Sequence, residues 1–127
     1  MKVLALDYGS ARTGVAVSDP TGTLARPLCV VEAAASEAGL ARIAELVHAE
    51  EVERVVVGLP LTLRGERGAQ AQETERFVEA LRAVLPVPVE SFDERFTTTL
   101  AGSHGEAPED ARAAAHLLSG YLTWASR

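Results

Sequence analysis

Acidic side chains stand where the apolar runs of this sequence end. The run at residues 3–7 ends in Asp7, and the run at residues 87–93 leads into Asp93 and Glu94. Asp110 lies in the first turn of a helix expected near the C-terminus. Carboxylates that gather at one edge of a sheet repel one another, and a cation relieves that repulsion. We therefore interpret these residues as candidate ligands of a metal ion.

The available donor atoms indicate which ion this would be. Carboxylate oxygens are hard ligands that suit Mg²⁺ or Mn²⁺. The chain has one cysteine and three widely spaced histidines, so it offers no thiolate or imidazole cluster for zinc. Two such ions about 4 Å apart stabilise the attacking and leaving oxygens when a phosphodiester is hydrolysed. The sequence thus predicts phosphodiester hydrolysis at a two-ion Mg²⁺ or Mn²⁺ site.

Four arginines fall in segments expected to leave the same sheet edge: Arg12, Arg64, Arg67 and Arg95. The net charge of −6 by itself argues against a nucleic-acid partner. Many of the acids lie on or beside the first expected helix, however, so the field at the sheet edge can still be positive. Phosphate binding follows the local field. We interpret the four arginines as contacts to nucleic acid, the alternative being that they are only solvated.

Smaller motifs allow a functional and a structural interpretation. Gly58 in "GLP" either lets substrate approach the backbone or forms a tight exit from a buried strand. The hydroxyl of Thr97 in "RFTT" either contacts a phosphate or caps a turn. Gly9 and Gly14 are interpreted as ordinary glycines of a hairpin.

The elements that position these residues follow from the apolar patterns. We expect strands at residues 2–7, 14–18, 23–31, 54–60 and 87–95, and helices at residues 36–50, 70–85 and 108–125. Ser36 is the expected N-cap of the first helix, and Pro27 suits an edge strand because it lacks an amide donor. This order requires right-handed crossovers and a mixed sheet in a single α/β domain, residues 1–127. Ligands of such sheets bind outside the carboxyl ends of the strands, where the acids are expected.

Length and composition exclude other classes. With 127 residues, 47% apolar and 24% charged, the chain is typical of one soluble domain. No apolar run approaches the roughly 20 residues of a membrane span, and Asp7 interrupts any signal-peptide core. A single cysteine fits a reducing compartment. We expect a cytoplasmic protein with no membrane partner.

Four segments carry a family resemblance: "ALDYGSARTGVAVSD", "VVVGLP", "FDERFTT" and "EDARAAAHLLSGYL". They resemble the YqgF/RuvX family of RNase H-like proteins, described as Holliday junction resolvases and as nucleases that mature the 5′ end of 16S rRNA. The resemblance implies an RNase H-like fold with a five-stranded sheet of order 3-2-1-4-5 and helices on both faces. It also implies that Asp7, Glu94 and Asp110 are the catalytic, metal-binding residues. Asp93 remains the alternative to Glu94, because a one-residue step along a strand reverses the face.

The sequence departs from the family pattern in two segments. "LTLRG" follows "GLP" where the family has a polar, Asn-containing stretch, and "LAGSHGEAPE" before the last helix contains no Lys or Arg. The first hypothesis is a metal-dependent endonuclease acting on structured RNA, in 5′-end processing of pre-16S rRNA on a pre-ribosomal particle. Alternatives are a resolvase-like nuclease acting on branched or single-stranded DNA and a catalytically weak adaptor in ribosome or transcription complexes. A sugar-kinase-like nucleotide-binding module, suggested by "DYGSARTG", would need a second domain.

Overall fold

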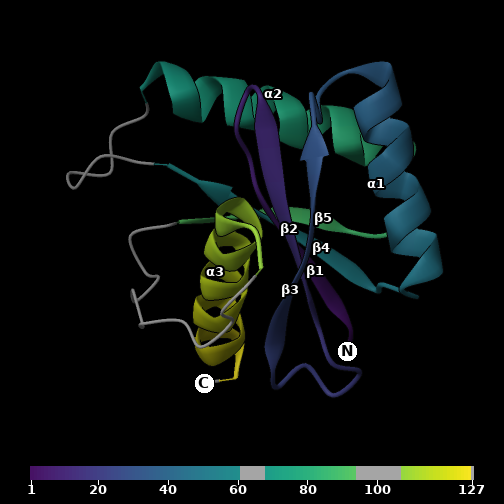
Figure 1. The fold of residues 1–127 in the computed structure, drawn as a ribbon, viewed down its shortest axis with the longest axis vertical. Coiled ribbons are helices and arrows are strands. Elements are labelled where there is room, and N and C mark those ends of the chain that lie inside the picture. The colour runs from purple at the N-terminus through teal and green to yellow at the C-terminus, as the bar shows by residue number, and fades with distance from the viewer. Residues whose placement is uncertain (61–67, 94–106, 127) are drawn as a thin grey trace.

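The alternation of strands and helices follows the order expected from the apolar patterns. The computed structural model describes residues 1–60, 68–93 and 107–126 (Figure 1). Its elements are β1 (Val3–Asp7), β2 (Arg12–Ser18), β3 (Ala25–Glu32), α1 (Glu37–Ala49), β4 (Arg54–Leu59), α2 (Ala69–Val84), β5 (Val89–Asp93) and α3 (Glu109–Ala125).

The strands form one sheet in the order β3-β2-β1-β4-β5, which confirms the expected topology. β1 pairs antiparallel with β2, and β2 pairs antiparallel with β3. β4 is parallel to both β1 and β5, so the carboxyl ends of these three strands share one edge. Pro27 lies in β3, which is an edge strand, as its missing amide donor predicts.

The two faces of the sheet are covered by different helices. α1 and α2 pack on one face around a cluster that includes Leu4, Leu6 and Phe77. α3 packs on the other face around a cluster that includes Ala5 and Leu118 (Figure 1). Successive residues of a strand point to opposite faces. The alternation of β1 therefore directs Asp7, two residues after Ala5, toward the α3 face.

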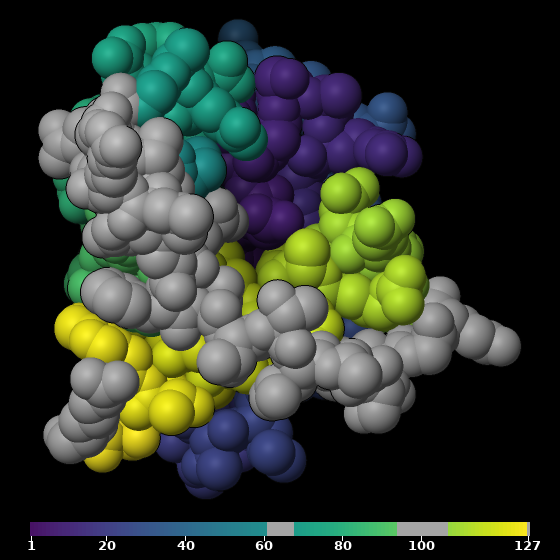
Figure 2. Space-filling model, turned by 90° about the vertical axis from the view of Figure 1, so that its left-hand side faces the viewer, coloured from purple at the N-terminus to yellow at the C-terminus, as the bar shows by residue number. Residues whose placement is uncertain are grey.

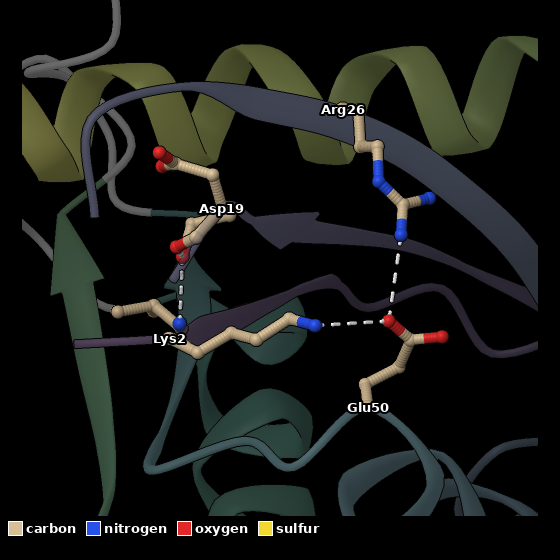
Figure 3. Close-up of polar contacts among 6 residues, drawn as sticks. Lys2, Asp19, Arg26 and Glu50 are labelled. Atoms are coloured by element: carbon tan, nitrogen blue, oxygen red, sulfur yellow. Dashed lines mark hydrogen bonds and ion pairs between the residues drawn. The ribbon is translucent and has the colours of Figure 1, made fainter. Parts of the chain in front are cut away.

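Local capping explains where α1 begins. The Ser36 hydroxyl accepts a hydrogen bond from the amide of Gly39 at 3.0 Å, so the expected N-cap is confirmed. At the other end of α1, Glu50 lies between two cations, with Oε1 at 3.4 Å from Lys2 Nζ and 3.4 Å from Arg26 NH2 (Figure 3). These ion pairs tie the end of α1 to the starts of β1 and β3, at the sheet edge opposite Asp7.

α3 is also fixed at its C-terminal end. The rings of Tyr121 and Trp124 lie 5.4 Å and 5.6 Å from the ring of Phe92 in β5. Arg54 NH1 donates a hydrogen bond to the Tyr121 hydroxyl at 3.1 Å. α3 thus runs from the carboxyl edge of the sheet to the opposite edge.

None of the helices among the described residues has the length and apolarity needed to cross a membrane.

Candidate active site

Asp7 lies at the end of the central strand with a glycine on each side. Gly14 of β2 is its register partner. Gly58 of β4 follows Val57, the partner of Leu6, and is therefore level with Asp7 on the next strand. Alternation places both glycines on the α3 face with Asp7. The sheet surface beside this half-buried carboxylate consequently has no side chain on either neighbouring strand.

Gly14 brings a second carboxylate to the same place. A Cβ atom built on Gly14 would overlap the carbonyl oxygen and carbon of Asp110, so the first turn of α3 rests directly on the backbone of β2. Because Gly14 also pairs with Asp7, residues 7 and 110 become neighbours although they are far apart in sequence. Figure 2 shows this start of α3 (yellow-green) beside the β1–β2 segment (purple).

This contact corrects one interpretation made from sequence. Gly14 does not lie in the hairpin turn but inside β2, which begins at Arg12 rather than at residue 14. Its lack of a side chain is required by helix packing. Gly9, in contrast, lies in the connection between the strands, where a Cβ atom would overlap the carbonyl oxygen of Arg12, so its interpretation as a turn glycine is confirmed.

Arg12 forms an ion pair with Asp110. Its Nε atom lies 3.4 Å from Asp110 Oδ2, and the two side chains are 67% and 39% exposed. Both residues line a groove of about 420 Å³, together with Val30, Glu32, Pro108 and Glu109. The structure thus places the candidate substrate contact Arg12 directly against a candidate metal ligand.

Residues that follow Asp7 fix the end of β1 against α2. The ring of Tyr8 stacks on Phe77, with centroids 4.4 Å apart. Burial and a hydrogen bond from its hydroxyl to Glu73 raise the pKa of Tyr8 to about 12. The buried Thr13 hydroxyl accepts a hydrogen bond from the Gly9 amide at 3.3 Å and so closes the loop. The positioning roles of Tyr8 and Thr13 were not predicted from the sequence, although Tyr8 directly follows the strand-end acid.

Asp93 lies on the other face of the sheet from Asp7. In β5, Val89 packs in the α1–α2 cluster, whereas Phe92 packs in the α3 cluster. Strand alternation therefore assigns Asp93 to the α1–α2 face. The remaining candidates lie outside the described residues: Arg64, Arg67, Glu94, Arg95 and Thr97.

The described residues contain two of the three expected carboxylates at the α3 face. No group of three or more His, Cys, Asp or Glu side chains within residues 1–60, 68–93 and 107–126 is arranged to hold a metal ion. Asp7 and Asp110 nevertheless offer the hard oxygen atoms that Mg²⁺ and Mn²⁺ prefer. The chemistry of these two donors therefore suits a divalent cation.

The comparisons with known proteins point to one family. The family model RuvX, described as "Holliday junction resolvase", matches residues 1–123. A protein of Chloroflexus aggregans named "Putative pre-16S rRNA nuclease" is 54% identical over 99 residues, which cover 78% of this chain and 70% of the relative. A protein of the same name from Anaeromyxobacter is 44% identical over 132 aligned positions, covering 96% of each chain.

A solved structure shares the fold. Thermus thermophilus RuvC in complex with a Holliday junction substrate superposes with a TM-score of 0.69. The match covers 99% of this chain and 95% of the RuvC chain, at 20% sequence identity. The mixed sheet with helices on both faces is therefore an RNase H-like fold, as expected from the sequence.

Proposed function

Because this chain belongs to the RuvX family, we propose that residues 1–127 form a single nuclease domain that hydrolyses phosphodiester bonds in structured nucleic acid. The observation that carries the proposal is the contact of α3 with Gly14. It brings the first turn of α3, which carries Asp110, close to Asp7 at the carboxyl edge of the sheet. Such an edge is where ligands of open α/β sheets bind.

Asp7, Glu94 and Asp110 are the proposed ligands of two Mg²⁺ or Mn²⁺ ions. When bound there, the ions would supply Lewis-acid stabilisation of the charge that develops on the phosphoryl oxygens. The assignment of Asp93 to the α1–α2 face argues against Asp93 as a ligand on the Asp7 face, and so supports the choice of Glu94. Asp7 and Asp110 act from fixed backbones, β1 held by α2 and α3 held by β2, so their carboxylates need little rearrangement to bind cations.

Substrate contacts are proposed around this edge. Gly14 is covered by the first turn of α3, so the absence of a side chain at Gly58 is what is proposed to let a phosphate approach the sheet beside Asp7. Arg12 supplies a cation from the start of β2, and Arg64, Arg67 and Arg95 are proposed to contact the phosphate backbone. The Thr97 hydroxyl is a further proposed phosphate contact.

The favoured substrate is the 5′ extension of pre-16S rRNA, in a cytoplasmic pre-ribosomal particle. The names of the relatives from Chloroflexus aggregans and Anaeromyxobacter support this choice. Branched DNA is the alternative substrate, because RuvC shares the fold and was solved with a Holliday junction.

A cleavage assay tests the proposal. Purified protein is incubated with Mn²⁺ and with three labelled substrates: a pre-16S 5′ fragment, a single strand of DNA and a four-way DNA junction. We expect cleavage of the RNA that is lost with EDTA and with Asp7→Asn. Glu53→Gln, at the opposite sheet edge, serves as the control and should cleave normally.

The other outcomes discriminate among the alternatives. Cleavage of the junction but not of the RNA would favour the resolvase-like DNA nuclease. RNA binding without cleavage of any substrate would refute the nuclease proposal and favour the adaptor.

A further inference from the structure

The groove beside the site has an unusual charge balance. Six described residues line it: Arg12, Val30, Glu32, Pro108, Glu109 and Asp110. Three of them are carboxylates, and Arg12 is the one basic residue among these six. The Arg12 guanidinium therefore lies in a groove whose carboxylates attract cations.

The two partners of the Arg12–Asp110 pair differ in how freely they can move. The backbone of Asp110 is held against Gly14, the register partner of Asp7, so the first turn of α3 stays close to the end of β1. The Arg12 side chain is 67% exposed, and its recorded contact is a single Nε–Oδ2 approach of 3.4 Å rather than a bidentate pair. An exposed monodentate pair of this kind is weak. Arg12 can consequently leave Asp110 without any movement of β2 or α3.

We propose that Arg12 acts as a placeholder for the divalent cation. While no ion is bound, its guanidinium neutralises Asp110 and reduces the repulsion between Asp110 and Asp7. When an ion binds, it competes with Arg12 for the same carboxylate, and the released guanidinium contacts a substrate phosphate. This inference rests on the proposed function, because it assumes that Asp110 is a metal ligand.

The competition has a measurable consequence without any substrate. If Arg12 must be displaced, its removal makes ion binding tighter. Removal of a guanidinium that does not contact Asp110 changes ion binding only through long-range repulsion, which is largely screened at about 0.15 M salt. Since exposed ion pairs are weak, we expect the dissociation constant for Mn²⁺ to fall about two- to fivefold in Arg12→Gln.

The test measures free Mn²⁺ by electron paramagnetic resonance in titrations of the intact protein. Arg26→Gln is the matched control, because Arg26 also makes a single ion pair of 3.4 Å to a carboxylate, and is 58% exposed, at the opposite sheet edge (Figure 3). We expect tighter Mn²⁺ binding in Arg12→Gln and unchanged binding in Arg26→Gln. Thermal unfolding verifies that both variants are folded.

Asp110→Asn separates failure of this inference from failure of the proposed function. If Asp110→Asn weakens Mn²⁺ binding but Arg12→Gln equals the wild type, the placeholder role is wrong and the metal site stands. If Asp110→Asn and Asp7→Asn both bind Mn²⁺ like the wild type, the metal site and the placeholder role both fail.

A second measurement tests the transfer of Arg12 to phosphate. Binding of a fluorescein-labelled RNA hairpin is followed at increasing salt, with Ca²⁺ in place of Mn²⁺ to avoid cleavage. The slope of log K against log salt is negative, and losing one phosphate contact should reduce its magnitude by about one in Arg12→Gln. An unchanged slope would overturn this part of the proposal.

Discussion

Asp7 and Asp110 are brought into the same region because Gly14 lets the first turn of α3 rest on the backbone of β2. The glycine is the register partner of one acid and touches the carbonyl group of the other. The two carboxylates could be chosen from the sequence, since each ends a strand or begins a helix. The role of Gly14 could not, because it depends on a contact between segments almost a hundred residues apart in the chain.

Gly14→Ala is expected to impair both folding and ion binding. The added methyl group would overlap the Asp110 carbonyl, so α3 must shift away from the sheet. Overpacking of this kind costs about 1–3 kcal/mol of unfolding free energy, measurable by urea denaturation. Mn²⁺ affinity should fall as well, because Asp110 moves with the helix. Gly68→Ala is the control for packing: its Cβ atom would meet nothing within 4 Å, so Mn²⁺ affinity should not change, and the poorer N-cap of α2 should cost about 1 kcal/mol of unfolding free energy at most.

Glu94→Gln and Asp93→Asn should differ in effect although the residues are adjacent. Glu94→Gln removes a proposed ligand charge, so a higher Mn²⁺ requirement and a turnover lower by orders of magnitude are expected. Asp93 belongs to the α1–α2 face, so Asp93→Asn should retain cleavage. Its free energy of unfolding should fall by about 1 kcal/mol at most, as when a capping side chain is lost. Single-turnover cleavage and urea denaturation measure the two effects. The opposite pattern would shift the assigned ligand by one residue.

For the helices and strands, the sequence predicted the type and order of the elements better than the residues at which they begin and end. Apolar periodicity is local, and all five strands and three helices were found where it indicated them. β2 begins two residues earlier than expected because Arg12 pairs with Glu32 of β3, a contact that periodicity does not encode. The packing of α3 on β2 likewise depends on tertiary contact.

The turn between β2 and β3 depends on an ionised carboxylate. Asp19 accepts hydrogen bonds from the Thr21 hydroxyl and from the amides of Leu24 and Thr23, the latter two at 3.0 and 2.8 Å. These hydrogen bonds lower the pKa of Asp19 below its ordinary value of 3.8, and the bond from Thr21 has the largest effect. A depressed pKa in the folded state contributes stability above the unfolded pKa and loses it as the pH falls through the folded value.

The pH dependence of unfolding should therefore change in Asp19→Asn. The wild type is expected to lose stability as the pH falls below about 4, and the variant should lose less over the same range. Urea midpoints measured at neutral and acidic pH provide the comparison. Glu45→Gln, which removes an exposed carboxylate of α1, is the control. Parallel pH profiles for the wild type and Asp19→Asn would show that the turn does not depend on this charge.

For the whole molecule, charge is distributed between the two sheet edges. Glu50 and Glu53 lie at the start of β1, where they contact Lys2. Asp7 ends the same strand five residues later, roughly 17 Å away at about 3.3 Å per residue. The described residues at the Arg12 edge are also net acidic, since Glu32, Glu109 and Asp110 lie around Arg12, so nucleic-acid binding there would depend on bound cations and on the proposed contacts of Arg64, Arg67 and Arg95.

Salt dependence of binding tests this distribution. Arg67→Ala and Arg95→Ala should each weaken the binding of every RNA sequence tested. Each should also reduce the magnitude of the negative slope of log K against log salt by about one. Arg26→Ala, at the edge near Glu50, should leave the slope unchanged. Fluorescence anisotropy at several salt concentrations measures all three. Equal slopes in all variants would mean that the nucleic acid does not follow the proposed edge.

The aromatic contacts at the end of α3 give the molecule a built-in optical reporter. Trp124 is the one tryptophan of the chain, is 45% exposed, and lies against Phe92 and Tyr121. Its emission therefore depends on whether α3 is seated on β5, the same helix whose first turn carries Asp110. Intrinsic fluorescence, excited selectively at the indole, can follow the seating of this helix without any label.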